Sequence, residues 1–197
     1  MTASPELRFD TGRLCLDLIA TVGSRLSDAP VERLHSPDRL KQWLVGTGLV
    51  PSSQPLAIDD SWLKRFHRLR TLLHRIVHAY LHSEPITSRD IDRLNQFARP
   101  APPVPQAHLL GDNHQGLRRV LNDPVTVEAL LAAVARDAIE LLSGSTAALL
   151  HECEGPTCDL VFIDTSRGHR RRWCASTICG NRERVIRHRQ KSSATSG

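Results

Sequence analysis

The chain has 197 residues and five cysteines, and four of the cysteines form two closely spaced pairs. Cys153 and Cys158 make one C-x4-C pair, and Cys174 and Cys179 make a second after an insert of fifteen residues. Zinc takes four thiolates in a tetrahedron, and two such pairs around a hairpin-sized insert are typical of this site. Protein would fill all four positions, so the sequence predicts a structural Zn²⁺ site, not a catalytic one. The alternatives are two disulfides or four unrelated buried thiols.

Basic residues concentrate in the same part of the chain. Residues 167–197 carry nine Lys or Arg and one Glu, whereas residues 1–166 carry 17 basic and 20 acidic residues. A dense basic stripe is typical of a protein that binds a polyanion, although charge does not distinguish DNA from RNA. Alternatively, some arginines only offset the double negative charge of a tetrathiolate zinc centre. The candidate nucleic-acid-binding residues are Arg167, Arg170, Arg171, Arg172, Asn181, Arg182, Arg184, Arg187, His188 and Lys191.

The residues around the cysteines indicate a hairpin followed by a helix. Residues 160–164 favour a strand, 165–168 a turn and 170–173 a returning strand, while 181–190 lack Pro and Gly and favour a helix. The start of that helix offers amides to a phosphate, and Val185 and Ile186 form its packing side. Such a small unit has almost no core, so we expect the metal to supply much of its folding energy.

The preceding region is predicted to be mainly helical. Apolar residues recur at helical spacing there, and several helices begin with an N-cap residue or a capping box. The fold class expected is mainly α: a helical domain with a small β-hairpin over residues 1–146, then a small zinc-bound hairpin plus helix over 147–197. The expected helices are 13–25, Ser36 to Gly48, 60–82 (with an apolar stripe from Trp62 to Tyr80), a helix from Thr87 with Ile91, Leu94 and Phe97 inward, and Asp123 to Ser143; the hairpin is 107–110 with 117–121.

Three weaker features lie in the helical region. His74, His78 and His82 recur every four residues but project to the polar side of their helix, so we expect solvated histidines rather than a metal site. Cys15 lies on an apolar helix face and is expected to be a buried core thiol. Asp17 is the one carboxylate in an otherwise apolar helix, and is either partly exposed or paired with an arginine.

The motif from Trp173 to Arg182, W-C-x4-C-G-N-R, resembles the CGNR-type zinc finger of bacterial regulators. The upstream F-x-D-x-S pattern of Phe162, Asp164 and Ser166 is similar to the same family. The stretch Cys15-Leu16-Asp17-Leu18, with Leu40 and Trp43-Leu44, is similar to the companion ABATE domain, described as a stress-induced transcription regulator. The resemblance covers nearly the whole chain and implies a zinc-dependent DNA-binding regulator.

The function expected is therefore transcription regulation in a stress response, with DNA as the partner. The helical domain would sense a small-molecule effector or mediate homodimer formation. The alternative is a protein–protein interaction module whose finger docks an acidic partner or a second copy. An enzyme is not expected, because no nucleophile elbow, Walker loop or dinucleotide fingerprint occurs. No apolar run suits a membrane span or a signal peptide, and the odd cysteine count favours the reducing cytoplasm.

Overall fold

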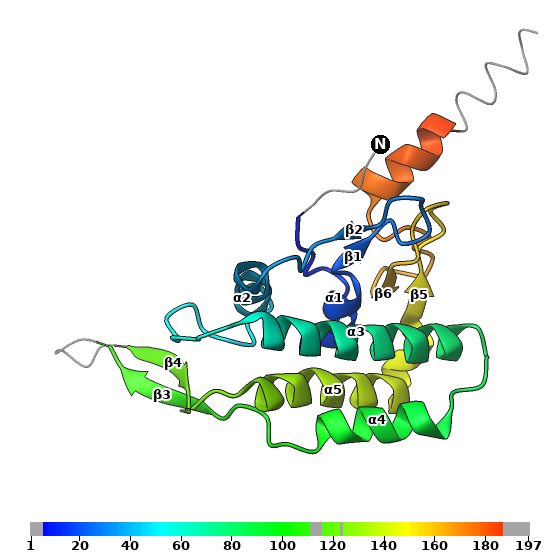
Figure 1. Ribbon diagram of the computed structural model, residues 1–197. Coiled ribbons are helices and arrows are strands. Elements are labelled where there is room, and N and C mark those ends of the chain that lie inside the picture. Colours follow the sequence, from blue (N-terminus) through cyan, green and yellow to red (C-terminus); the bar gives the residue numbers. More distant parts are fainter. Residues whose placement is uncertain (1–5, 111–115, 123, 187–197) are drawn as a thin grey trace, which may run out of the picture.

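The computed structural model describes residues 6–110, 116–122 and 124–186 (Figure 1). Its helices are α1 (Leu14–Ile19), α2 (Pro37–Gly46), α3 (Asp60–Leu81), α4 (Ser88–Ala98) and α5 (Val127–Ser143). Three antiparallel pairs of strands accompany them: β1 (Val22–Gly23) with β2 (Val31–Glu32), β3 (Pro105–Leu109) with β4 (Leu117–Leu121), and β5 (Leu150–Glu152) with β6 (Val161–Ile163). The mainly α fold and the predicted hairpin are confirmed.

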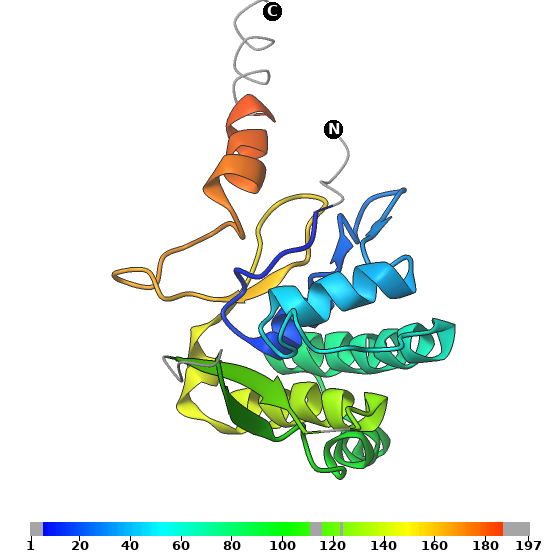
Figure 2. The same ribbon diagram turned by 90° about the vertical axis from the view of Figure 1, so that its left-hand side faces the viewer.

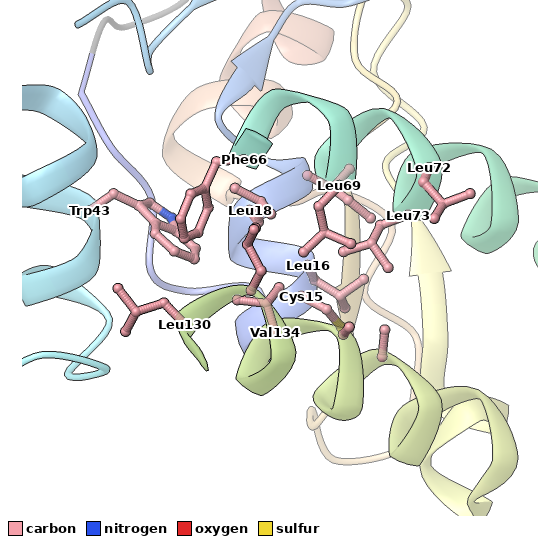
Figure 3. Packing of buried hydrophobic residues seen from close by; sticks show 14 of the residues in the cluster. Cys15, Leu16, Leu18, Trp43, Phe66, Leu69, Leu72, Leu73, Leu130 and Val134 are labelled. Carbon is pink, nitrogen blue, oxygen red and sulfur yellow. The ribbon is translucent and has the colours of Figure 1, made fainter. Parts of the chain in front are cut away.

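The short helix α1 lies at the centre of the core. Cys15, Leu16 and Leu18 are fully buried, and they lie between the side chains of α3 and α5 (Figure 3). The ring of Trp43 on α2 meets that of Phe66 on α3 edge to face, with centroids 5.9 Å apart. Cys15 is thus the buried core thiol that the sequence predicts, and burial raises its pKa well above the usual value.

Most helices begin at the predicted caps. Ser36 Oγ accepts a hydrogen bond from the Arg39 amide, and Thr87 Oγ1 accepts one from the Asp90 amide. The last long helix differs, because Thr126 Oγ1 accepts a hydrogen bond from the Ala129 amide and α5 begins at Val127. The predicted cap Asp123 lies outside the described residues.

Helix α1 is shorter than the predicted 13–25. It ends at Ile19, and Val22 lies in strand β1, where it pairs with Glu32 of β2. The side chain of Thr21 donates to the Leu18 carbonyl and accepts from Arg70, so tertiary contacts end the helix early. Two residues expected on apolar faces are also largely exposed, Tyr80 at 40% and Ile91 at 39%.

The predicted returning strand over 170–173 is wrong. Strand β6 pairs with β5 instead, with Phe162 opposite His151, and its other edge receives residue 11, since the Ile163 amide donates to the Thr11 carbonyl at 2.8 Å. Residues 170–173 only approach the first cysteine loop, where the Glu154 amide donates to the Arg172 carbonyl. One edge of β6 is therefore paired with β5 and the other with residue 11, so neither edge is open to residues 170–173.

We call residues 6–149 the body and residues 150–186 the finger. Leu150, Val161 and Ile163 of the finger belong to the same hydrophobic cluster as the helices of the body. In Figure 1, β5 and β6 accordingly lie against the end of the body, next to α1 and α3. The predicted division at residue 146 stays a prediction, and the core packing runs across it.

Within the described part of the chain, none of the helices combines the length and the apolar character that crossing a membrane requires.

Candidate metal centre and basic surface

The four paired cysteines converge at the junction of three finger segments. Cys153 follows β5, Cys158 lies in the loop after it, and Cys179 lies in a π-type turn over Ser176–Gly180. The four sulfur atoms all lie within 4.8 Å of one another, with Cys158 Sγ 3.9 Å and Cys179 Sγ 3.6 Å from Cys174 Sγ. A tetrahedron with metal–sulfur bonds of about 2.3 Å requires edges of about 3.8 Å. The sulfurs therefore fit one zinc ion, and they are too far apart for disulfides.

The first cysteine loop is shaped to bring its sulfurs together. The Cys158 amide donates to the Gly155 carbonyl at 2.9 Å, which closes a tight turn. A Cβ atom at Gly155 would lie only 3.3 Å from Cys179 Sγ, so glycine lets the loop approach the second pair. The Cys174 amide, 3.3 Å from Cys153 Sγ, also donates to this centre.

The electrostatics of the four thiols suit metal binding. Hydrogen bonds from Cys153, Cys158 and Cys179 lower the pKa of Cys174, and the charge of Arg8 adds to this effect. A hydrogen bond with Cys158 lowers the pKa of Cys153 to about 7, while those of Cys158 and Cys179 are raised. The cluster thus holds shared protons that a cation replaces, since metals bind the thiolate form.

Arg8 is a functional neighbour that sequence reasoning missed. Its guanidinium donates to Cys174 Sγ at 3.1 Å and to the Cys174 carbonyl at 2.9 Å, and it also pairs with Asp10 at 2.7 Å. It neutralises part of the charge of a tetrathiolate centre. The two residues are 166 positions apart, so no local pattern announces the contact.

Arg171, a candidate for nucleic-acid binding, is used inside the finger. Its guanidinium lies 4.3 Å above the Phe162 ring and donates to the carbonyls of Trp173 and Cys174. Its amide donates to the buried carboxylate of Asp164, which also accepts from the Ser166 amide. These hydrogen bonds lower the pKa of Asp164 to about 2, and the one with Ser166 has the largest effect. The F-x-D-x-S pattern thus shapes the segment that leads to Cys174.

The other arginines of this segment face outward. Arg167, Arg170 and Arg172 are exposed, and Arg172 stacks on Trp173 at 5.0 Å while it pairs with Glu154 at 2.5 Å. Next to them is a surface cavity of about 410 Å³. Its lining includes Asp10, Arg170, Arg171, Arg172, Ser176 and Thr177.

The helical segment 181–186 follows the second cysteine pair and stands away from the body in both ribbon views (Figures 1 and 2). Arg182 Nη1 donates to Thr157 Oγ1 at 2.9 Å, and the exposed Arg184 donates to Asn181 Oδ1 at 2.7 Å. The amides predicted to be free here are partly used, because the Asn181 amide donates to the Ile178 carbonyl and the π-type turn precedes it. The packing side expected of Val185 is also wrong, since that residue is 50% exposed.

Three further candidates, Arg187, His188 and Lys191, lie outside the described residues.

The histidines of α3 differ from the expected solvated set. His74 Nε2 lies 2.8 Å from Asp159 Oδ2, and His82 Nε2 lies 2.9 Å from Glu152 Oε2, so the row faces the finger. The carboxylate of Asp17 is buried and accepts hydrogen bonds from the amide and hydroxyl of Thr11, not from an arginine. Burial raises the pKa of Asp17 to about 6.

Two known families match the chain, one over most of the body and one over the finger. Residues 12–145 match the ABATE family, described as "Putative stress-induced transcription regulator", and residues 150–192 match the CGNR zinc finger. None of the curated proteins compared with the chain matches it. The resemblance noted in the sequence is thereby confirmed, and the four clustered cysteines are a structural zinc site.

Proposed function

Because the chain belongs to the ABATE family and carries a CGNR zinc finger, we propose that it is a transcription regulator whose zinc-held finger binds DNA. The observation that carries this proposal is the row of outward arginines on the segment that enters the metal centre. Arg167, Arg170 and Arg172 precede Cys174 directly, so the zinc site fixes the backbone that presents them.

The cavity beside these arginines suits a phosphate group. Its guanidinium and hydroxyl donors are of the kind that positions a protein on the nucleic-acid backbone. Asp10 lies in the same wall, but it is paired with Arg8 and so offers less repulsion to an anion. Arg182 and Arg184 extend the basic surface onto the helical segment.

In this proposal the body has the regulatory role and the chain has no catalytic one. The body binds an effector or joins two copies, and the protein acts on DNA in the cytoplasm, where thiols stay reduced and available to zinc. The unusual buried carboxylate Asp17 and the contacts of the α3 histidines with the finger give the body two places where a change would reach the finger.

A salt-dependent binding measurement tests the proposal. The zinc-loaded chain is titrated onto a labelled pool of random duplexes at several salt concentrations, and anisotropy is recorded. We expect binding that weakens with salt, and a slope smaller by about 0.9 for each phosphate contact removed. Arg170→Gln should show this reduction, and the exposed Arg93→Gln on α4 is the matched control. A flat titration at low salt would exclude DNA binding by the finger.

Exposed apolar residues of the π-type turn and the helical segment favour a second candidate. Ile178 is 42% exposed and Val185 is 50% exposed, beside the arginines. A surface of this kind suits docking of an acidic protein or a second copy. In that case purified protein would retain its partner after nuclease treatment, while the duplex titration stays flat.

A further inference from the structure

A second group of metal-ligating side chains lies between the body and the finger, apart from the four cysteines. His74 and His78 lie one turn apart on α3, and both face Asp159, the residue after Cys158. The ligand atoms of these three side chains all lie within 4.8 Å of one another. His74 Nε2 is 2.8 Å and His78 Nε2 is 4.0 Å from Asp159 Oδ2.

The state of His78 indicates that this is more than an ion-paired cluster. Its Nε2 is buried, and among the described residues it has no hydrogen-bond partner, although it lies near Asp159. A buried nitrogen in this state carries a cost that a ligand would remove. Burial also lowers the pKa of His78 to about 4, so its ring is the neutral imidazole that metals bind.

We propose that His74, His78 and Asp159 bind a divalent transition-metal ion, separate from the structural zinc. Two histidines at i and i+4 on a helix present nitrogen atoms to one ion, and a carboxylate completes a three-ligand set with positions left for water. The ion bridges the long helix of the body and the first cysteine loop of the finger. The proposal does not depend on DNA binding.

A second row of side chains lies beside the first. Glu152 Oε2 lies 3.9 Å from the other ring nitrogen of His78, Nδ1, and 2.9 Å from His82 Nε2. A carboxylate on the opposite nitrogen of a metal-bound histidine orients the ring and strengthens the ligand. Glu152 is thus a positioning residue of the proposed site, and His82 supports it.

Arg25 is the competing charge. Its Nε lies 3.2 Å from Asp159 Oδ2, so without a metal the guanidinium neutralises this carboxylate, and His74 Nε2 lies 2.8 Å from the same oxygen. A bound ion takes over this neutralising role from the guanidinium. Removing the guanidinium should therefore strengthen metal binding, whereas it would weaken a cluster that serves only as an ion pair between body and finger.

The test uses the full chain that already contains one equivalent of zinc, titrated with Co²⁺. We expect one further equivalent, with visible d–d bands but without the intense near-ultraviolet charge-transfer band of cobalt bound to thiolate. His74→Asn and His78→Asn should each weaken Co²⁺ binding at least tenfold, and Arg25→Gln should strengthen it. The exposed His35→Asn is the control and should bind as the parent chain does.

Zinc content and helical circular dichroism of each variant show whether it has kept the fold. If a histidine variant loses either, Glu152→Gln decides, because loss of an outer partner lowers metal affinity about tenfold to a hundredfold. The proposal is overturned if no second equivalent binds, if the bound cobalt shows only thiolate bands, or if the variants on α3 and His35→Asn lose binding equally.

Discussion

The body and the finger are held together in different ways. The body buries large apolar side chains from α1, α2, α3 and α5, among them Trp43, Phe66 and Leu130, and its helices carry their own caps. The finger contributes only five described residues to a separate buried cluster, which Ala20 of the body completes, and three of the five are the metal ligands Cys153, Cys174 and Cys179. One chain therefore combines a body stabilised by burial with a finger stabilised by coordination, and we expect only the finger to depend on a metal.

The apolar core of the body and the cysteine cluster of the finger meet at β5 and β6. Strands β5 and β6 belong to the finger by sequence, yet Leu150, Val161 and Ile163 pack in the core of the body. Phe162, between two of them on the other face of β6, packs with the cysteines. The alternation of a strand thus joins the two clusters, because neighbouring side chains point to opposite faces.

Removing the metal should give the largest difference between the regions. Cys174→Ser leaves three ligands, and zinc contributes about 10–16 kcal/mol to small metal-dependent domains. We expect hydrogen exchange to become fast in the cysteine loops and at residues 170–186, and to stay slow in α3 and α5. If protection disappears from both regions together, the body depends on the metal as well, and the comparison fails.

A cavity in the body should give the opposite pattern: it should lower the stability of the body and leave the zinc bound to the finger. Phe66 is fully buried, so Phe66→Ala should lower the free energy of unfolding by about 3–5 kcal/mol in chemical denaturation. Zinc content should remain at one equivalent. The control is Leu117→Ala on β4, which is 67% exposed and should change stability by less than about 0.5 kcal/mol.

Asp17 should make the body sensitive to pH. Its pKa is raised from 3.8 to about 6, so the folded chain binds the additional proton between these values and the stabilisation is lost as pH rises through about 6. The parent chain should lose about 2–3 kcal/mol from this group between pH 4 and 7, and Asp17→Asn should not. Denaturation of both proteins across this range measures the difference, and parallel profiles would contradict it.

The smallest effect is expected at a helix cap of the body. Thr87→Ala removes the hydroxyl that accepts from the Asp90 amide and should cost about 1 kcal/mol. Thermal unfolding measures the change. Thr165→Ala, an exposed threonine of the finger, should leave the midpoint unchanged, and an equal shift in both variants would show that the cap is not the cause.

Local patterns in the sequence predicted what local chemistry decides. The cap at Ser36, the hairpin after the proline-rich segment and the ligand pairs were all identified because the residues that make them lie within a few positions of one another. The family motif singled out Phe162 and Asp164, and the structure shows that they shape the segment before Cys174.

What the sequence could not predict depends on contacts between distant segments. The guanidinium of Arg8 reaches Cys174 over 166 positions, and His74 meets Asp159 over 85. The partner predicted for β6 was also wrong. The predicted hairpin placed that partner after the turn, at residues 170–173, whereas the strand that pairs with β6 is β5, which lies before the first cysteine. The apolar periodicity of α3 led to a prediction of solvated histidines, because it could not show that their side of the helix faces the finger.

The hydrogen bond between Thr11 and Ile163 has a consequence for how the protein is made. Residue 11 is synthesised 152 residues before Ile163, so this contact can form only after all the intervening residues have been made. Gly12 has a φ of +93°, and a Cβ atom there would lie 3.1 Å from the Cβ of Ile163, so glycine allows the two segments to approach closely. Changes to residues 6–12 should therefore delay completion of the zinc centre, whose cysteines are synthesised much later in the chain.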